Sequence, residues 1–366
     1  MRKDEITNKV MKGYTMSKEY WSEREKKSRE RTTALLDTLP KYVSKFETYI
    51  SDSTSALTRE NYIRDLTLFF GYVSDELELG SPLNVEIKIL AGLSVDFLAS
   101  YSKYLSNNTK NDGTSIKVTT KSRRLSAVRA LFKYLYDTDQ IPQNPMTKIH
   151  SPKVDDKEII RLEDDEASDL LRTITTGVGT EGSKQAEKYN SLQNLRDMTI
   201  VSLLLNTGMR VSECVGLDLG DIDTKRAAVR VIRKGHSEYS TLYYNSDMAE
   251  LLDNYLSYRK KLNGIADGSE NALFLSSRKQ RIGVRSVEVL VKKYTDRAGI
   301  LKPITPHKLR STYGTTLYQK TGDIKAVADS LGHKSIETTS RKYVESSKER
   351  RMALREVVNF TDDESE

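Results

Sequence analysis

The segment TPHKLRSTYGTTLYQKTGDIKAVADSLGHKSIETTSRKYV, residues 305–344, contains two of the four histidines of the chain. Thr305 and Pro306 are typical of a helix start, because threonine can cap the first turn and proline needs no N–H there. His307 and Arg310 then lie three positions apart, on one face near the positive end of that helix. Such a helix end favours an anion such as phosphate. An HxxR pair alone is more often an ordinary surface feature, so the neighbouring sequence decides.

The second half of this segment adds a histidine and a tyrosine. The stretch IKAVADSL predicts a short helix that Gly332 ends, and His333 follows directly. Its neutral imidazole could donate to a phosphate oxygen. Tyr343 lies ten residues further on and is one of 20 tyrosines. A tyrosine with its ordinary pKa of about 10 becomes a nucleophile at neutral pH only beside a base or in a cationic pocket.

Such a pocket needs further positive charges, and Arg210 in NTGMRVSECVGL is one candidate. It follows Gly208, where a buried helix is predicted to end, and Glu213 three residues later could hold its guanidinium in place. An arginine at a helix junction is usually structural. Together with Arg310, however, it could hold both non-bridging oxygens of one phosphodiester and stabilise a five-coordinate phosphorane.

A hairpin contributes another cation. Apolar and polar residues alternate on both sides of KGHS in RAAVRVIRKGHSEYSTLYYN, which predicts two antiparallel strands. Lys234 at the turn is ordinarily solvent-facing, yet a mobile ammonium there could protonate a leaving alkoxide. Arg233 remains an alternative for this role, because spacing does not distinguish the two.

Positive charge is concentrated in residues 110–153, which contain nine Lys or Arg and three Asp. The resulting excess of +6 is nearly the net charge of +7 of the whole chain. A solvated charged face would explain any one of these residues, but the cluster favours phosphate binding. We therefore expect nucleic acid as the partner, with contacts from Lys121, Arg123, Arg124 and Arg129.

The periodicity of apolar residues predicts a mainly α protein with a small β-hairpin or sheet. The stretch DQIPQNPMTKIHSPK holds three of the seven prolines and indicates a linker between two domains. Residues 18–36 mix both charge signs and predict an exposed helix, whereas 177–191 predict a polar loop. The expected organisation is an N-terminal helical extension (1–38), a helical core DNA-binding domain (39–140), a linker (141–155), an α+β catalytic domain (156–348), and a C-terminal helix with an acidic tail (349–366).

Composition excludes several classes of protein. No apolar run approaches the length needed to span a bilayer, so we expect no membrane segment. The first residues carry no apolar stretch, and we expect no secretory signal. Cys214 is the only cysteine, which argues against a disulfide framework and a structural zinc site and indicates a reducing cytoplasm.

Taken together, these residues resemble the active site of the tyrosine recombinases, the family of the Xer, Cre-type and phage integrase enzymes. The family's residue types occur in the family's order across 134 residues, and the contexts TGMRVSE and SLGHKS also match. TRENYIRDLTLFFGYV and KSRRLSAVRALFKYL look like the first and last helices of the family's core-binding domain. The resemblance covers residues 40–350, and its six active-site positions are Arg210, Lys234, His307, Arg310, His333 and Tyr343.

The resemblance implies a site-specific recombinase in which Tyr343 attacks the scissile phosphate and forms a 3′-phosphotyrosine. Arg210 and Arg310 would hold the non-bridging oxygens, and Lys234 would protonate the leaving 5′-oxygen. His307 would transfer a proton to or from the tyrosine, and His333 would donate to the phosphate. The ester conserves the energy of the broken bond, so we expect neither ATP nor a metal cofactor. Consistently, the chain lacks a GxxxxGK[ST] motif.

The resemblance also implies a homotetramer on two DNA duplexes, each with a short inverted-repeat site. Each subunit would pass its C-terminal helix to a neighbour, and SKERRMALREVVNF offers an apolar stripe for this contact (Met352, Leu354, Val357 and Val358).

Among the family's branches, the chain looks most like a cytoplasmic, nucleoid-associated Xer enzyme that resolves chromosome or plasmid dimers before cell division. The N-terminal extension and the 177–191 insertion depart from the shortest Xer pattern and leave an integrase or excisionase of a mobile element as the alternative. A type IB topoisomerase, which relaxes DNA with similar residues, is a more distant alternative. A non-catalytic DNA-binding regulator is the remaining class, and the complete set of six residues argues against it.

Overall fold

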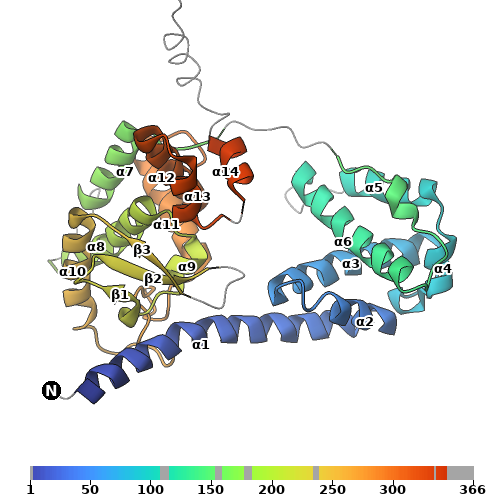
Figure 1. The fold of residues 1–366 in the computed structure, drawn as a ribbon, viewed down its shortest axis with the longest axis horizontal. Helices are drawn as coiled ribbons and strands as arrows, with labels where there is room; N and C mark the ends of the chain where they lie inside the picture. The colour runs from blue at the N-terminus through green and yellow to red at the C-terminus, as the bar shows by residue number, and fades with distance from the viewer. Residues whose placement is uncertain are drawn as a thin grey trace, which may run out of the picture. The chain divides into compact units, whose positions relative to one another are not determined.

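A computed structural model describes residues 3–107, 115–152, 159–176, 184–233, 239–333 and 335–343 (Figure 1). The chain forms two compact units. Trp21–Asp156 form the first, here called the helical unit, and Met1–Tyr20 with Lys157–Glu366 form the second, here called the mixed unit. Among the described residues, no helix is both long and apolar enough to cross a membrane.

The helical unit is built around aromatic side chains from three helices. Phe69, Phe70, Tyr101 and Phe132 are almost completely buried, and their rings meet edge to face. Such contacts stabilise a small core beyond the effect of buried area alone. The elements are the second half of α1 (Lys3–Leu36), α2 (Lys41–Tyr49), α3 (Ala56–Glu76), η1 (Pro82–Asn84), α4 (Ile87–Gly92), α5 (Val95–Asn107), α6 (Val118–Asp137) and η2 (Pro145–Lys148).

The helix α1 is less exposed than its charged sequence predicts. Ser28 and Thr32 are only 4% and 5% exposed, and Ser28 Oγ donates to Glu60 Oε2 at 2.7 Å. Two small hydroxyl residues one turn apart therefore line the buried face of the helix. The sequence has no apolar stripe on this face. Hydrophobic periodicity could not reveal this face because it is polar.

The first half of the predicted linker (141–155), which follows α6, belongs to the core of the helical unit. Ile141, Met146 and Ile149 are buried there, although proline interrupts any periodic pattern. Arg129 Nη2 donates to the Ile149 carbonyl at 2.9 Å, which ties this segment to α6.

Within the described chain, the mixed unit combines the first half of α1, eight further α-helices and one 3-10 helix with one small sheet. The strands β1 (Ile222–Asp223), β2 (Ala228–Ile232) and β3 (Tyr239–Tyr243) pair antiparallel in that order, with Val229 opposite both Ile222 and Leu242. The predicted hairpin and fold class are confirmed. The helices are α7 (Asp164–Thr176), α8 (Lys184–Thr207), α9 (Val211–Val215), η3 (Leu219–Asp221), α10 (Ser246–Arg259), α11 (Val284–Arg297), α12 (Pro306–Thr321), α13 (Ile324–Leu331) and α14 (Ile336–Tyr343).

One local prediction was wrong in part. The stretch 177–191 was expected to be a polar loop, but α8 begins at Lys184 and includes its second half. Good helix formers such as Lys184, Gln185, Ala186 and Glu187 account for this start. Residues 177–183 lie outside the described residues.

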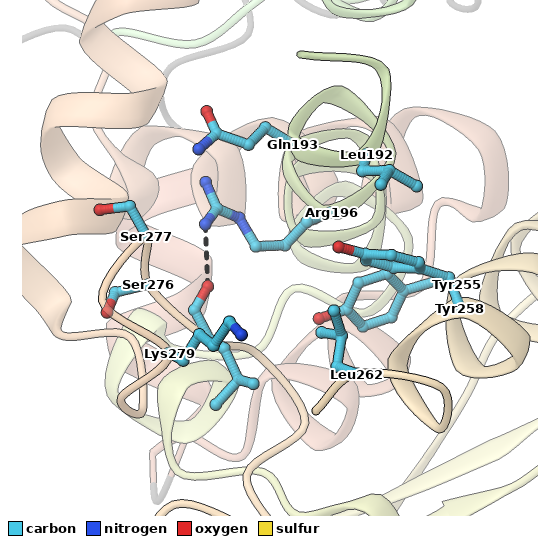
Figure 2. A pocket seen from close by; sticks show the side chains of 10 residues that line it. Leu192, Gln193, Arg196, Tyr255, Tyr258, Leu262, Ser276, Ser277 and Lys279 are labelled. Carbon is cyan, nitrogen blue, oxygen red and sulfur yellow. Dashed lines mark hydrogen bonds between the residues drawn. The ribbon is translucent and has the colours of Figure 1, made fainter. Parts of the chain in front are cut away.

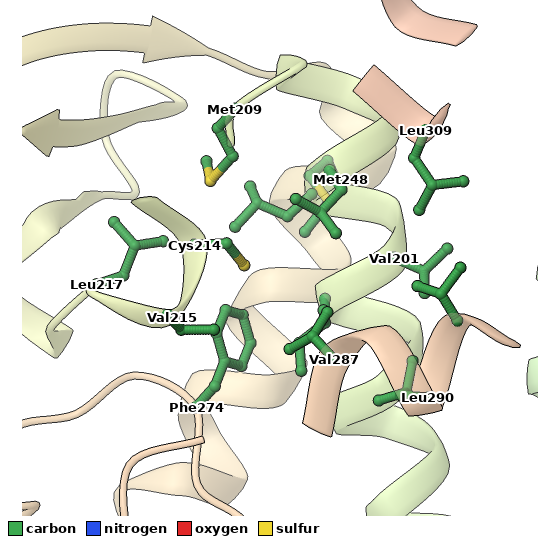
Figure 3. Packing of buried hydrophobic residues seen from close by; sticks show 14 of the residues in the cluster. Val201, Met209, Cys214, Val215, Leu217, Met248, Phe274, Val287, Leu290 and Leu309 are labelled. Atoms are coloured by element: carbon green, nitrogen blue, oxygen red, sulfur yellow. The ribbon is translucent and has the colours of Figure 1, made fainter. Parts of the chain in front are cut away.

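The core of the mixed unit surrounds α8 (Figure 3). Val201 on that helix belongs to the same buried cluster as Met209, Cys214 and Phe274, which are at most 1% exposed, and α11 supplies Val287. The short α9 is therefore held in the core by its apolar side. This burial leaves the residue at its N-terminal end, Arg210, half-buried at the surface.

Two buried carboxyl groups lie next to this core. The Asp218 backbone N–H donates to Asp221 Oδ2 at 2.9 Å, and the Arg281 guanidinium forms an ion pair with Asp218. Asp221 Oδ1 has no hydrogen-bond partner among the described atoms. Burial raises the pKa of the Asp221 carboxyl to about 7, and the charge of Asp218 acts in the same direction.

We expect Asp221→Asn to stabilise the protein at pH 8 by about 1–2 kcal/mol. A carboxyl with a higher pKa in the folded state costs stability as pH rises from its unfolded value of 3.8 to about 7. The neutral amide avoids this loss. Chemical unfolding between pH 5 and 8 would show a flatter pH dependence for Asp221→Asn than for the wild type. The half-buried Asp223, changed to Asn, serves as the control and should follow the wild-type curve.

Candidate active site

Arg210 is fixed by a carboxylate on its own helix. It is the N-cap residue of α9, and its backbone N–H donates to Glu213 Oε2 while Nη1 donates to Oε1, both at 2.8 Å. Glu213 is only 3% exposed, whereas the Arg210 side chain is 31% exposed. The contact expected from their spacing is present. It leaves a guanidinium with a fixed orientation at the surface of the unit.

Arg310 joins two helix ends that are distant in the sequence. Its guanidinium is 4% exposed, and it donates to the Gly208 carbonyl at 2.7 Å and to the Leu331 carbonyl at 2.5 Å. Gly208 lies two residues before Arg210, and Leu331 lies two residues before His333. One buried arginine therefore brings the ends of α8 and α13 to the start of α12.

The start of α12 matches the sequence only in part. Thr305 occupies the N-cap position and Pro306 the first turn, but the threonine side chain makes no capping hydrogen bond. His307 is exposed, one turn before the buried Arg310. The imidazole and the guanidinium thus share a helix end but differ in solvent access.

His333 is held by its own helix and by α14. Its backbone N–H donates to the Ala328 carbonyl at 3.0 Å, which completes the end of α13. Its Nδ1 lies 2.7 Å from the hydroxyl of Thr339, a fully buried residue of α14. This contact orients the imidazole. Gly332, directly before His333, has φ of +60°, a conformation in which glycine is preferred.

Arg233 is a functional candidate that the sequence left open. It follows β2 directly, is 7% exposed, and donates from Nη2 to the Ser330 carbonyl at 2.7 Å. Its Nη1 is buried without a partner among the described atoms. Burial lowers the pKa of this guanidinium, Glu213 opposes the shift, and Arg210 adds to it. A side chain anchored in this way does not suit the mobile acid considered for the hairpin.

Two of the six active-site candidates cannot be placed completely. Lys234 lies outside the described residues, directly after Arg233. Tyr343 is the last residue of α14, whose backbone packs against α12 and α13 (Figure 1). The structure therefore gathers Arg210, Arg310 and His333 around three helix ends.

The basic residues of the helical unit lie at the start of α6 and differ in their partners. Lys121 Nζ donates to Ser106 Oγ at 2.6 Å, and Arg123 forms an ion pair with the buried Asp65. Arg124 is half-buried, and its Nε and Nη1 have no partner among the described atoms. Arg129 lies further along the helix and is bonded to the Ile149 carbonyl.

A pocket of the mixed unit lies between Leu192, Arg196, Tyr255 and Lys279 (Figure 2). Arg196 Nη1 donates to the Leu275 carbonyl at 2.8 Å, and Lys279 Nζ donates to the Asn263 carbonyl at 2.5 Å. None of the six candidate residues lines it. Its cations are already satisfied by backbone oxygens, so we do not assign the chemistry to it.

Comparison with known proteins identifies the family. Residues 161–350, more than half of the chain, match the model of the phage integrase family. Tyrosine recombinase XerC of Caldanaerobacter subterraneus subsp. tengcongensis is 32% identical over 335 residues, covering 87% of this chain and 86% of that protein. The chain belongs to this family. It is a site-specific DNA recombinase of the Xer-like type, an enzyme that transfers DNA strands.

A further relative supports this assignment, and two solved structures show a similar fold. Tyrosine recombinase XerS of Streptococcus thermophilus is 31% identical over 80% of this chain and 88% of its own length. XerH recombinase bound to a palindromic difH substrate has a similar fold, with a TM-score of 0.64 and 21% identity over 83% of this chain and 81% of that one. The Tn1549 transposon integrase in complex with transposon right end DNA gives a TM-score of 0.60 at 18% identity, covering 85% and 97%.

We expect Gly332→Ala to destabilise the recombinase by at least about 2 kcal/mol more than Gly322→Ala. Both glycines end a helix in the left-handed conformation, with φ of +60° at Gly332 and +67° at Gly322. Both substitutions therefore introduce similar backbone strain. A Cβ at position 332 would lie 1.6 Å from Arg233 Nη1, whereas position 322 has nothing within 4 Å. Denaturant unfolding of the two variants measures the difference, and equal losses would contradict the close packing of Arg233.

Proposed function

We propose that Tyr343 is the nucleophile of strand cleavage and that Arg210 and Arg310 bind the scissile phosphate. The observation that carries this proposal is the Arg310 guanidinium, which is bonded to Gly208, 102 residues away in the sequence, and to Leu331. These contacts bring Arg210 and His333 to one place. Two guanidinium groups and an imidazole are well suited to the negative charge of a phosphorane.

The proposed step is a transesterification. The phenolic oxygen of Tyr343 attacks the phosphorus, and the bond from phosphorus to the 5′-oxygen breaks. His307 accepts the phenolic proton, Lys234 supplies a proton to the 5′-oxygen, and His333 donates to a non-bridging oxygen. Attack by the 5′-hydroxyl of another strand reverses these transfers and reseals the backbone. Glu213 supports the reaction by holding Arg210.

We propose that α6 contributes DNA contacts through Lys121, Arg123 and Arg124. Arg124 is half-buried, and its Nε and Nη1 are buried without a partner among the described atoms, so a phosphate contact from this side chain would come from Nη2 or require a change of rotamer. Arg123 is ion-paired with Asp65 but remains 44% exposed. Arg129 was expected to belong to this set, and its bond to Ile149 supports a mainly structural contribution.

We propose that the enzyme recombines two short inverted-repeat sites as a homotetramer and resolves chromosome or plasmid dimers at the nucleoid. The similarity to XerC and XerS over most of the chain supports this biological function. The palindromic substrate to which XerH is bound supports the inverted repeat. Integration of a mobile element is the alternative, and it would use the same chemistry.

We expect Tyr343→Phe to abolish the covalent adduct between the protein and a nicked suicide duplex that carries its recombination site. DNA affinity should change less than about threefold, because the substitution removes one hydroxyl and no charge. Denaturing electrophoresis measures the adduct, and a mobility-shift titration measures affinity. Tyr318→Phe is the control at a buried tyrosine of α12 and should keep the adduct. An adduct formed by Tyr343→Phe would assign the nucleophile to another residue.

We expect Arg124→Met to weaken DNA binding about tenfold and to reduce the slope of log K against log salt by about one. The substitution keeps an unbranched apolar stem and removes the charge that would meet a phosphate. Binding constants measured from about 50 to 250 mM salt give the slope, which changes by about one unit for each phosphate contact that is lost. Lys88→Met, at an exposed lysine of α4, should leave the slope unchanged. Equal slopes for the wild type and Arg124→Met would remove Arg124 from the interface.

A further inference from the structure

The N-terminal helix delivers one aromatic ring to the mixed unit. Tyr20 is half-buried, packs against the apolar core of this unit, and lies with its ring centroid 4.9 Å from Arg281 Cζ. We propose that Tyr20 is a positioning residue for strand cleavage. It holds Arg281, which fixes the C-terminal end of α9 and thereby Arg210 at the other end. The inference rests on the phosphate-binding role proposed for Arg210.

Arg281 is the link between the ring and α9. Its Nη1 donates to the carbonyls of Val215 at 3.2 Å and Leu217 at 2.9 Å, and its Nη2 pairs with Asp218. The side chain is only 14% exposed. A guanidinium whose flat face is covered by an aromatic ring gains a cation–π contact and loses freedom to rotate. The two carbonyls that follow α9 are therefore held in one geometry.

Gly216, between these two carbonyls, shows how closely the ring approaches. A Cβ at this position would lie 3.2 Å from Cδ1 and Cε1 of Tyr20 and 3.2 Å from the Ser212 carbonyl. The Ser212 carbonyl belongs to the preceding turn of the same helix, and at 3.2 Å it is as close to this Cβ position as the ring of Tyr20. The ring of Tyr20 is thus one of two close contacts that favour glycine here. The φ angle of Gly216 is −80°, so backbone strain does not require glycine.

The short length of α9 makes this contact relevant to the active site. The helix has five residues, and at 1.5 Å per residue its ends are separated by about 8 Å. The Arg210–Glu213 pair lies less than two turns from the C-terminal end of α9, so a shift of that end also displaces the pair. Displacement of a catalytic group by about 1 Å can lower a rate up to about a hundredfold. Binding of DNA relies on many other contacts and should change little.

The first experiment compares Tyr20→Ala, Tyr20→Phe and the wild type in adduct formation on the suicide duplex at saturating DNA. We expect Tyr20→Ala to slow the single-turnover rate about tenfold, with a DNA affinity within about twofold of the wild type. Tyr20→Phe should restore the rate because it keeps the ring. Tyr243→Ala removes a tyrosine that is 68% exposed and should react like the wild type.

The second experiment separates positioning from a loss of folding. Thermal unfolding identifies the fraction of each variant that is folded, and rates are compared per folded molecule. Gly216→Ala should slow adduct formation severalfold in the wild type, because its methyl group displaces the ring. In the Tyr20→Ala background its effect should be smaller, because only the close contact with the Ser212 carbonyl remains, and this difference appears as coupling in the double-mutant cycle.

The outcomes distinguish this inference from the proposed function. A wild type that forms no adduct overturns both. An active wild type with an equally active Tyr20→Ala overturns the positioning role alone, and so do additive effects of Tyr20→Ala and Gly216→Ala. Slow cleavage that Phe does not rescue also overturns it, because the ring would then not be the group that acts.

Discussion

The Arg310 guanidinium is buried between two backbone carbonyls, one from the end of α8 and one from the end of α13. Removing a charged group from water is costly unless it is fully hydrogen-bonded. Carbonyl oxygens orient the guanidinium without neutralising it, so its positive charge is kept. The same two bonds decide where Arg210 and His333 lie, since each follows a bonded residue by two positions. The arrangement of the proposed active site therefore depends on this one side chain.

Glycines make the approach of these helix ends possible. Gly208 ends α8 with φ of +60°, and a Cβ there would lie 2.3 Å from the ring of Tyr313 and 2.9 Å from Leu331. Gly332 ends α13 in the same conformation against Arg233. At both positions the chain needs a left-handed residue and also has no space for a side chain. Helix ends can therefore meet at distances that let one guanidinium bridge them.

Local patterns in the sequence predicted the elements that depend on neighbouring residues. The Arg210–Glu213 contact follows from helical spacing, the hairpin from alternation, and the ends of α8 and α13 from Gly208 and Gly332. Contacts between distant segments were not accessible in this way. The burial of Arg233 depends on Ser330, 97 residues away, and nothing near Arg233 in the sequence indicates it. The polar buried face of α1 and the contact of Tyr20 with Arg281 were missed for the same reason.

The charges around α9 suggest why the site holds several arginines and few carboxylates. Arg210, Arg233 and Arg310 carry three positive charges, and Glu213 is the carboxylate paired with one of them, which leaves a net charge of +2 for these four side chains. A phosphodiester carries one negative charge, and a five-coordinate phosphorane carries two. In the phosphate-binding role proposed for Arg210 and Arg310, this net charge would match the transition state better than the ground state, which is the condition for catalysis rather than tight binding. The carbonyl partner of Arg233, Ser330, leaves the positive charge of that guanidinium in place, whereas a carboxylate partner would offset it.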